Sequence, residues 1–197
     1  MKFVLASDSP RRKQLLSQFN LDLLIKPHQF NEASVEKEGC PLEYCMSISK
    51  GKAQSLISQY PASPILSADT VVTIDGKILE KPIDKDEAFN MLTILSGREH
   101  KVITGVSLFY RDKKINFSFS EETIVKFISL TNKEILYYIE QYEPYDKSGA
   151  YGIQDFSAIF VESIKGCFFN VMGLPLSTLF QYLKKFDLVQ FPLNTGK

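Results

Sequence analysis

The stretch Leu5-Ala6-Ser7-Asp8-Ser9-Pro10-Arg11-Arg12 changes abruptly from an apolar strand pattern to the start of a helix. Ser9 is a good N-cap residue, and Pro10 suits the first helical position. The free N–H groups of a helix N-terminus attract anions, and arginine donates forked hydrogen bonds that match phosphate oxygens. The stretch therefore predicts a strand that leads into a helix, with a phosphate cradle at the turn. The alternative is an ordinary capped surface helix whose arginines are solvated.

Strand and helix patterns alternate along the rest of the chain and predict a mixed α/β domain. A tight hairpin turn is expected at Asp75-Gly76. Capping-box patterns, Asp84 with Glu87 and Thr131 with Glu134, begin two of the helices. The expected strands cover residues 2–6, 22–26, 64–74, 78–79, 101–110, 114–129 and 157–164, and the expected helices cover residues 10–19, 41–59, 84–95, 131–141 and 174–186.

Length and charge exclude several classes of protein. The chain has 197 residues, of which 44% are hydrophobic, enough for a sizeable core in one domain or two closely joined lobes. Lys plus Arg and Asp plus Glu number 23 each, so no basic field argues for a nucleic acid or a membrane partner. We find no signal-peptide pattern and no membrane-length apolar stretch. We therefore expect a soluble cytoplasmic protein that recognises a phosphate-bearing partner locally, with a loose tail over residues 188–197.

The cysteines and histidines give no metal or disulfide signature. Cys40, Cys45 and Cys167 form neither an even disulfide framework nor zinc-ligand doublets, so we expect them to be reduced. His28 and His100 are far apart and have no ligand spacing. We expect both histidines to be structural or solvated.

An acidic residue, Asp69, lies within the apolar strand expected over residues 64–74. A carboxylate among apolar neighbours is unfavourable unless it meets a metal, a cation or several hydrogen-bond donors. The alternative is a strand-end aspartate that is hydrogen-bonded to a neighbouring loop. The residues alone leave both interpretations open.

Three further polar blocks, each taken alone, are typical of solvated loops. They are Glu80-Lys81-Pro82, Ser96-Gly97-Arg98 with the following His100 and Thr104-Gly105, and residues 143–154. The last block contains two glycines close together, which permit close approach of the backbone to a ligand. A self-contained Ω-type loop is the alternative.

Taken in order, these blocks resemble the Maf family of nucleoside triphosphate pyrophosphatases. The resemblance covers nearly the whole chain. It implies one α/β domain over residues 1–187, related to the inosine-triphosphatase type, with an elongated mixed β-sheet flanked by helices, a cleft between two lobes and usually a homodimer. The matching blocks are residues 5–12, Lys52-Ala53, 68–72, 79–82, 95–98, 146–154 and 170–176.

The resemblance also implies roles for individual residues. Arg12, Lys52 and Lys81 correspond to the cations that bind the triphosphate, and Ser7 and Ser9 supply neutral donors. Such groups would hold and neutralise the substrate while water attacks its α-phosphorus.

Glu32 and Asp69 are the candidate ligands of a divalent cation, Mg²⁺ or Mn²⁺, because such ions take oxygen ligands. Asp69 is also the candidate general base, which either takes the proton itself or orients the attacking water. Three departures from the family pattern lie close to these positions. Asn31 replaces an aspartate, Asp155 replaces a glycine and Cys167 replaces another aspartate.

Arg11, Thr70 and Gln154 resemble the selectivity residues of the branch that hydrolyses dTTP and UTP. A guanidinium would repel a cationic 7-methylguanine, whereas the Gln154 amide can pair with a pyrimidine. The expected substrate is therefore a pyrimidine nucleoside triphosphate, dTTP or UTP, which yields a monophosphate and pyrophosphate. The competing functions are 7-methyl-GTP hydrolysis and non-catalytic nucleotide binding in the control of cell division.

Overall fold

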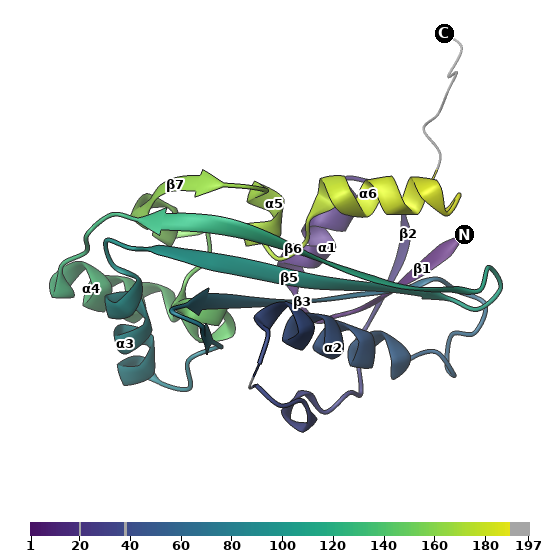
Figure 1. The fold of residues 1–197 in the computed structure, drawn as a ribbon, viewed down its shortest axis with the longest axis horizontal. Coiled ribbons are helices and arrows are strands. Elements are labelled where there is room, and N and C mark those ends of the chain that lie inside the picture. Colours follow the sequence, from purple (N-terminus) through teal and green to yellow (C-terminus); the bar gives the residue numbers. More distant parts are fainter. Residues whose placement is uncertain (20, 38, 190–197) are drawn as a thin grey trace, which may run out of the picture.

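The computed structural model describes residues 1–19, 21–37 and 39–189, which form a seven-stranded mixed sheet flanked by helices. The strand order is β2-β1-β3-β5-β6-β7, and β4 pairs with β3. The strands are β1 (Lys2–Ala6), β2 (Asp22–Lys26), β3 (Ile65–Ile74), β4 (Lys77–Leu79), β5 (Glu99–Tyr110), β6 (Ile115–Phe127) and β7 (Val161–Lys165). β1 is parallel to β2 and β3, and the other pairs are antiparallel. The expected elongated mixed sheet is confirmed, and its length comes from β5 and β6 (Figure 1).

The helices cover both faces of this sheet. They are α1 (Pro10–Ser17), α2 (Pro41–Gln54), α3 (Lys85–Leu95), α4 (Asn132–Tyr142), α5 (Phe168–Val171) and α6 (Leu176–Lys185). Short 3₁₀ turns cover Glu32–Ser34, Pro144–Asp146, Ser148–Ala150 and Phe156–Phe160. α1 and α6 lie on the opposite side of the sheet from α2, and α3 and α4 lie together at the far end (Figure 1). None of the helices within the described ranges is long and apolar enough to cross a membrane.

The helix-start signals are largely confirmed. The Ser9 side chain accepts a hydrogen bond from the Arg12 backbone N–H, with Pro10 in the first turn. The capping box of Thr131 and Glu134 is complete. At α3 the Asp84 carboxylate caps the Glu87 N–H, but the Glu87 carboxylate accepts from Ile83 instead of closing a box.

The strand expected over residues 157–164 is wrong in its first half. Residues Phe156–Phe160 form a 3₁₀ turn, and β7 begins only at Val161. A short apolar run fits a strand or a helical turn equally well. Tertiary packing decides here, because the buried Phe160 ring packs against Phe127 and Tyr138.

Two helices and the tail also differ from expectation at their ends. α2 ends at Gln54 rather than near residue 59, and α6 begins after Pro175. The tail is not loose from its start, because Leu188 is buried and its N–H donates to the Leu183 carbonyl oxygen. The rest of the expected tail, residues 190–197, lies outside the described residues.

Two apolar clusters lie on the same face of the sheet, one beside α1 and α6 and the other beside α3 and α4. β3 contributes Leu66 and Ala68 to the first cluster and Val72 and Ile74 to the second. Because side chains alternate along a strand, Thr70 lies on this same face, between the clusters. The first helix and the last helix thus meet one half of β3, and the central helices meet the other half.

The opposite face of the sheet is covered by α2, which approaches β5 closely at Gly105. A Cβ atom at Gly105 would lie 2.6 Å from the carbonyl carbon and oxygen of Cys45. Cys45 is buried, and burial raises the pKa of its thiol to about 12. The three cysteines are free, as expected.

His100 is a buried histidine whose Nε2 atom lies 2.7 Å from the Tyr151 hydroxyl oxygen. Burial lowers the pKa of His100 from 6.5 to about 4. As the pH falls, His100 therefore becomes protonated near pH 6.5 in the unfolded chain but only near pH 4 in the folded chain. The contribution of the neutral His100 to the free energy of unfolding is fully present above pH 6.5 and is lost as the pH falls from 6.5 to about 4.

We expect His100→Gln, which keeps a polar partner for Tyr151 and does not titrate, to lose less stability than the parent protein on acidification. The difference should be about 2–3 kcal/mol between pH 6.5 and 4, measured by urea unfolding at a series of pH values. Parallel pH profiles of the two proteins would contradict this role of His100.

Candidate active site

Part of one edge of β3 has no strand beside it. β1 pairs with β3 only at Ile65 and Leu66, and β4 pairs with it only from Val72 onward. Within β3, Asp69 and Thr70 are the two positions that are partly exposed. The polar side chains at the centre of an otherwise buried strand therefore become accessible because β1 has already ended.

A cavity of about 420 Å³ opens at this edge. It is bordered by the turn after β1, by β3, by the loop of residues 146–154 and by residues 171–173. Each site residue expected from the sequence lines this cavity: Ser7, Ser9, Arg11, Arg12, Glu32, Lys52, Asp69, Thr70, Lys81 and Gln154. The structure thus brings together groups that are up to 147 positions apart in the chain, counting from Ser7 to Gln154.

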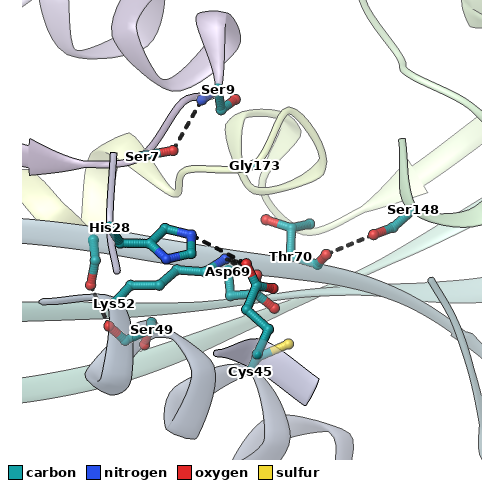
Figure 2. Close-up of polar contacts among 12 residues, drawn as sticks. Ser7, Ser9, His28, Cys45, Ser49, Lys52, Asp69, Thr70, Ser148 and Gly173 are labelled. Atoms are coloured by element: carbon teal, nitrogen blue, oxygen red, sulfur yellow. Dashed lines mark hydrogen bonds and ion pairs between the residues drawn. The ribbon is translucent and has the colours of Figure 1, made fainter. Parts of the chain in front are cut away.

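On the α2 side of the sheet, one ammonium group joins two carboxylates. Lys52 Nζ lies 2.7 Å from Asp69 Oδ1 and 3.1 Å from Glu32 Oε1, and the Lys52 side chain is only 7% exposed. His28 Nε2 lies 3.2 Å from Glu32 Oε1. The hydrogen bond from His28, supported by the charge of Lys52, lowers the pKa of Glu32 to about 2. Figure 2 shows His28, Lys52 and Asp69 converging at this point.

On the other side of the sheet, the Arg12 guanidinium is held by three acceptors. It donates from Nη2 to the Thr70 hydroxyl (2.9 Å), from Nε to the Gly173 carbonyl oxygen (2.9 Å) and from Nη1 to the Ser7 hydroxyl (3.4 Å). Burial lowers the pKa of Arg12, and the negative charge of Asp69 opposes this effect. Gly173 has a φ of +106°, a conformation that favours glycine. The arginine is thus fixed in place before any ligand binds.

Behind Arg12, the hydrogen bonds close into a ring. The Thr70 and Thr104 hydroxyl oxygens are 2.9 Å apart, and Thr104 donates to the Asn170 carbonyl oxygen at 3.2 Å. The same carbonyl accepts from the Gly173 N–H at 2.9 Å. Thr104 and Asn170 are both buried. The segment around residue 170, whose role the sequence did not explain, therefore supports the cavity from behind.

The loop of residues 146–154 is attached to the rest of the cavity by charges. Arg11 lies 3.1 Å from the Asp146 carboxylate, which lies 2.7 Å from Lys147 Nζ. Lys147 also lies 3.4 Å from Asp155, so the aspartate that departs from the family pattern joins the two ends of the loop. Ser148 donates to the Thr70 carbonyl oxygen at 2.9 Å, as Figure 2 shows. Gln154 lies at the exposed rim, where its Nε2 is 3.5 Å from Gln14 Oε1.

The remaining predicted groups have simpler surroundings. Lys81 lines the cavity and forms no ion pair with any residue that the structure describes. The Asn31 side chain accepts from the Ala33 N–H and caps the short turn that carries Glu32. Cys167 precedes α5, and its backbone N–H and carbonyl oxygen both meet the Thr123 hydroxyl. Neither Asn31 nor Cys167 lines the cavity.

A family model for Maf-like proteins matches residues 2–186. The chain belongs to the Maf family.

Several relatives of this Maf protein are similar over nearly their whole length. A dTTP/UTP pyrophosphatase from Thermoanaerobacter sp. is 47% identical, covering 95% of this chain and 98% of the relative. Those from Carboxydothermus hydrogenoformans and Pyrococcus furiosus are 45% and 44% identical, covering 94% and 93% of this chain and 98% and 94% of the relatives. Among solved structures, a dITP/XTP pyrophosphatase from Mycobacterium abscessus has 13% identity and a TM-score of 0.49, covering 100% of both chains. A HAM1 protein from Coxiella burnetii has 14% identity and a TM-score of 0.49, covering 94% and 99%.

Sequence reasoning missed some residues of this Maf site. His28 was expected to be structural or solvated, but it contacts Glu32 and lines the cavity. No local pattern indicated this contact, because residues 28–31 lie outside any helix and spacing alone does not bring their side chains together. Thr104 and Asn170 belong to blocks that the sequence had singled out, but their contact was not predicted, because it joins residues that are 66 positions apart.

Proposed function

We propose that this Maf protein is a pyrophosphatase that hydrolyses dTTP and UTP to the nucleoside monophosphate and pyrophosphate. The observation that carries the proposal is the Asp69 carboxylate at the open edge of β3, held 2.7 Å from Lys52 inside a cavity lined with cations. Relatives that are 44–47% identical over nearly the whole chain bear the name dTTP/UTP pyrophosphatase, which supports the choice of substrate.

The triphosphate would bind where Lys52, Lys81 and Arg12 surround the cavity, beside the N-terminal turn of α1. Cations and backbone N–H groups neutralise the phosphate oxygens and keep them away from the path of the attacking water. Water attacks the α-phosphorus, the bond from this phosphorus to the bridging oxygen breaks, and pyrophosphate leaves with the electron pair of that bond. The same cations stabilise the charge that develops on the leaving pyrophosphate.

Asp69 would accept the proton of the attacking water. Its Oδ1 receives the hydrogen bond from Lys52, whereas its Oδ2 has no hydrogen bond within the described part of the chain. One carboxylate oxygen is therefore fixed and the other is available. Lys52 orients this base and offsets the repulsion between the Asp69 and Glu32 carboxylates, since it contacts both.

The donor set fits a divalent cation that is completed by the substrate. No three Asp, Glu, His or Cys side chains gather into a metal centre within the described ranges. Mg²⁺ commonly binds one or two carboxylates together with substrate phosphates, and Glu32 and Asp69 supply such a pair. When bound, the cation, Mg²⁺ or Mn²⁺, would neutralise phosphate charge and make the phosphorus more electrophilic.

Base selection is assigned to Arg11, Thr70 and Gln154. Asp146 holds Arg11 at the mouth of the cavity, and Ser148 fixes the backbone of Thr70. The homodimer expected from the family resemblance stays a prediction of the sequence.

A panel of nucleoside triphosphates tests the reaction and the substrate together. We expect nucleoside monophosphate and pyrophosphate as initial products, with kcat/KM for dTTP and UTP about tenfold or more above that for purine triphosphates, since one lost polar contact in a desolvated pocket costs about 1–3 kcal/mol. Products can be identified by ion-exchange chromatography. Release of diphosphate and orthophosphate would refute the reaction, 7-methyl-GTP as the best substrate would refute the base assignment, and binding without turnover would indicate a regulator.

Asp69→Asn should lower kcat by about 100-fold or more, because the amide cannot accept the proton. Asp75→Asn is the matched control, since Asp75 lies in the exposed turn after β3 and pairs with Arg98 outside the cavity. Thermal unfolding should confirm that both variants fold. Near-normal turnover by Asp69→Asn would remove Asp69 from the mechanism.

Chelation tests the cation. Treatment with EDTA should abolish turnover of dTTP, and added Mg²⁺ or Mn²⁺ should restore it, because Lys52 already pairs with both carboxylates and a divalent cation would supply the further positive charge that a triphosphate needs. Glu32→Gln should raise the Mn²⁺ concentration needed for half-maximal activity. Full turnover after exhaustive chelation would contradict the cation site.

A further inference from the structure

Thr104 lies directly behind Thr70 but does not itself line the cavity. It is fully buried in β5, opposite Thr70 in the pairing of β3 with β5. Its hydroxyl oxygen contacts the Thr70 hydroxyl at 2.9 Å and the Asn170 carbonyl oxygen at 3.2 Å. Thr104 can therefore influence a nucleotide through Thr70.

The direction of these hydrogen bonds follows from what each group can donate. A carbonyl oxygen only accepts, a guanidinium only donates, and a hydroxyl has one proton and two lone pairs. Thr104 gives its proton to the Asn170 carbonyl, so its oxygen accepts the proton of Thr70. The Thr70 oxygen also accepts from Arg12 Nη2 at 2.9 Å. One lone pair of Thr70 then remains for a ligand, and its proton is already committed.

The opposite direction is less favourable. If Thr104 donated to Thr70, its oxygen would face the Asn170 carbonyl oxygen in a buried site with no proton between them. Two buried lone pairs in contact repel each other and forfeit a hydrogen bond. Gly173 holds both ends of the ring, because its N–H donates to the Asn170 carbonyl and its own carbonyl accepts from Arg12.

We propose that Thr104 is a positioning residue that makes Thr70 a pure hydrogen-bond acceptor toward the nucleotide, so that the cavity selects uracil and thymine over cytosine. This inference rests on the proposed function. Uracil and thymine carry an N3–H donor where cytosine has an N3 lone pair, so an acceptor on the protein pairs with the former and repels the latter. Gln154 cannot make this distinction alone, because its amide can turn to present either an N–H or an oxygen.

The test compares kcat/KM for UTP and CTP in the parent protein, Thr104→Val and Thr104→Ser. The parent protein should prefer UTP by about tenfold or more. Thr104→Val keeps the shape but removes the oxygen that accepts the Thr70 proton, so this proton becomes free to pair with cytosine N3. The preference for UTP should then fall to about twofold or less. Thr104→Ser restores the hydroxyl and should restore the preference.

Thr73→Val is the matched control, because Thr73 is a buried threonine on β3 that does not line the cavity. It should keep the parent preference. Affinities of UTP and CTP for the Asp69→Asn variant, with and without Thr104→Val, measure the same selection apart from turnover. Equal use of UTP and CTP by the parent protein, or an unchanged preference in Thr104→Val, would overturn the inference. Selective binding of UTP without hydrolysis would instead refute the proposed function while supporting the role of Thr104.

Discussion

The short stretch of β3 without a neighbouring strand is the constraint on which the rest of the site depends. β1 leaves β3 after Leu66 and β4 joins it at Val72, so the backbone between them needs other partners. Ser148 meets this need at the Thr70 carbonyl and thereby brings the loop of residues 146–154 over the edge. The same gap uncovers Asp69 and Thr70, which a continuous sheet would bury. The pairing of the strands, the position of the loop and the exposure of the Asp69 carboxylate therefore all depend on the same gap.

The alternation of side chains along β3 divides the tasks of the site between the two faces of the sheet. Asp69 meets Lys52 from α2 on one face, where Lys52 also pairs with Glu32. Thr70 meets Arg12 from α1 on the other face, where a ring of hydrogen bonds orients the Thr70 hydroxyl. Because the cavity lies at an open edge, one substrate can reach both faces. Asp69 holds Lys52 and Thr70 holds Arg12, so both cations are oriented before a substrate binds.

Local signals in the sequence were reliable where the physics is local. Ser9 with Pro10 and Thr131 with Glu134 begin helices because a side chain caps N–H groups only two or three residues away. The apolar run before β7 predicted a strand, but it forms a 3₁₀ turn because Phe160 packs on aromatic rings that are distant in the sequence. His28 was undervalued for a similar reason. The role of His28 depends on tertiary contacts, because the fold places its ring against Glu32 and the Glu32 carboxylate against Lys52.

By itself the sequence determined the family, the mixed α/β class and ten of the residues that line the cavity. The family and these residues follow from motifs that occur in order along the chain, and the α/β class follows from side-chain periodicity. It could not determine which groups are paired before a ligand binds, or in which direction a hydroxyl points. Those properties belong to contacts such as Thr104 with Asn170 and α2 with Gly105, which join segments that are far apart. Only the tertiary structure decides them, since packing brings the donors and acceptors within reach and the count of protons and lone pairs then favours one arrangement.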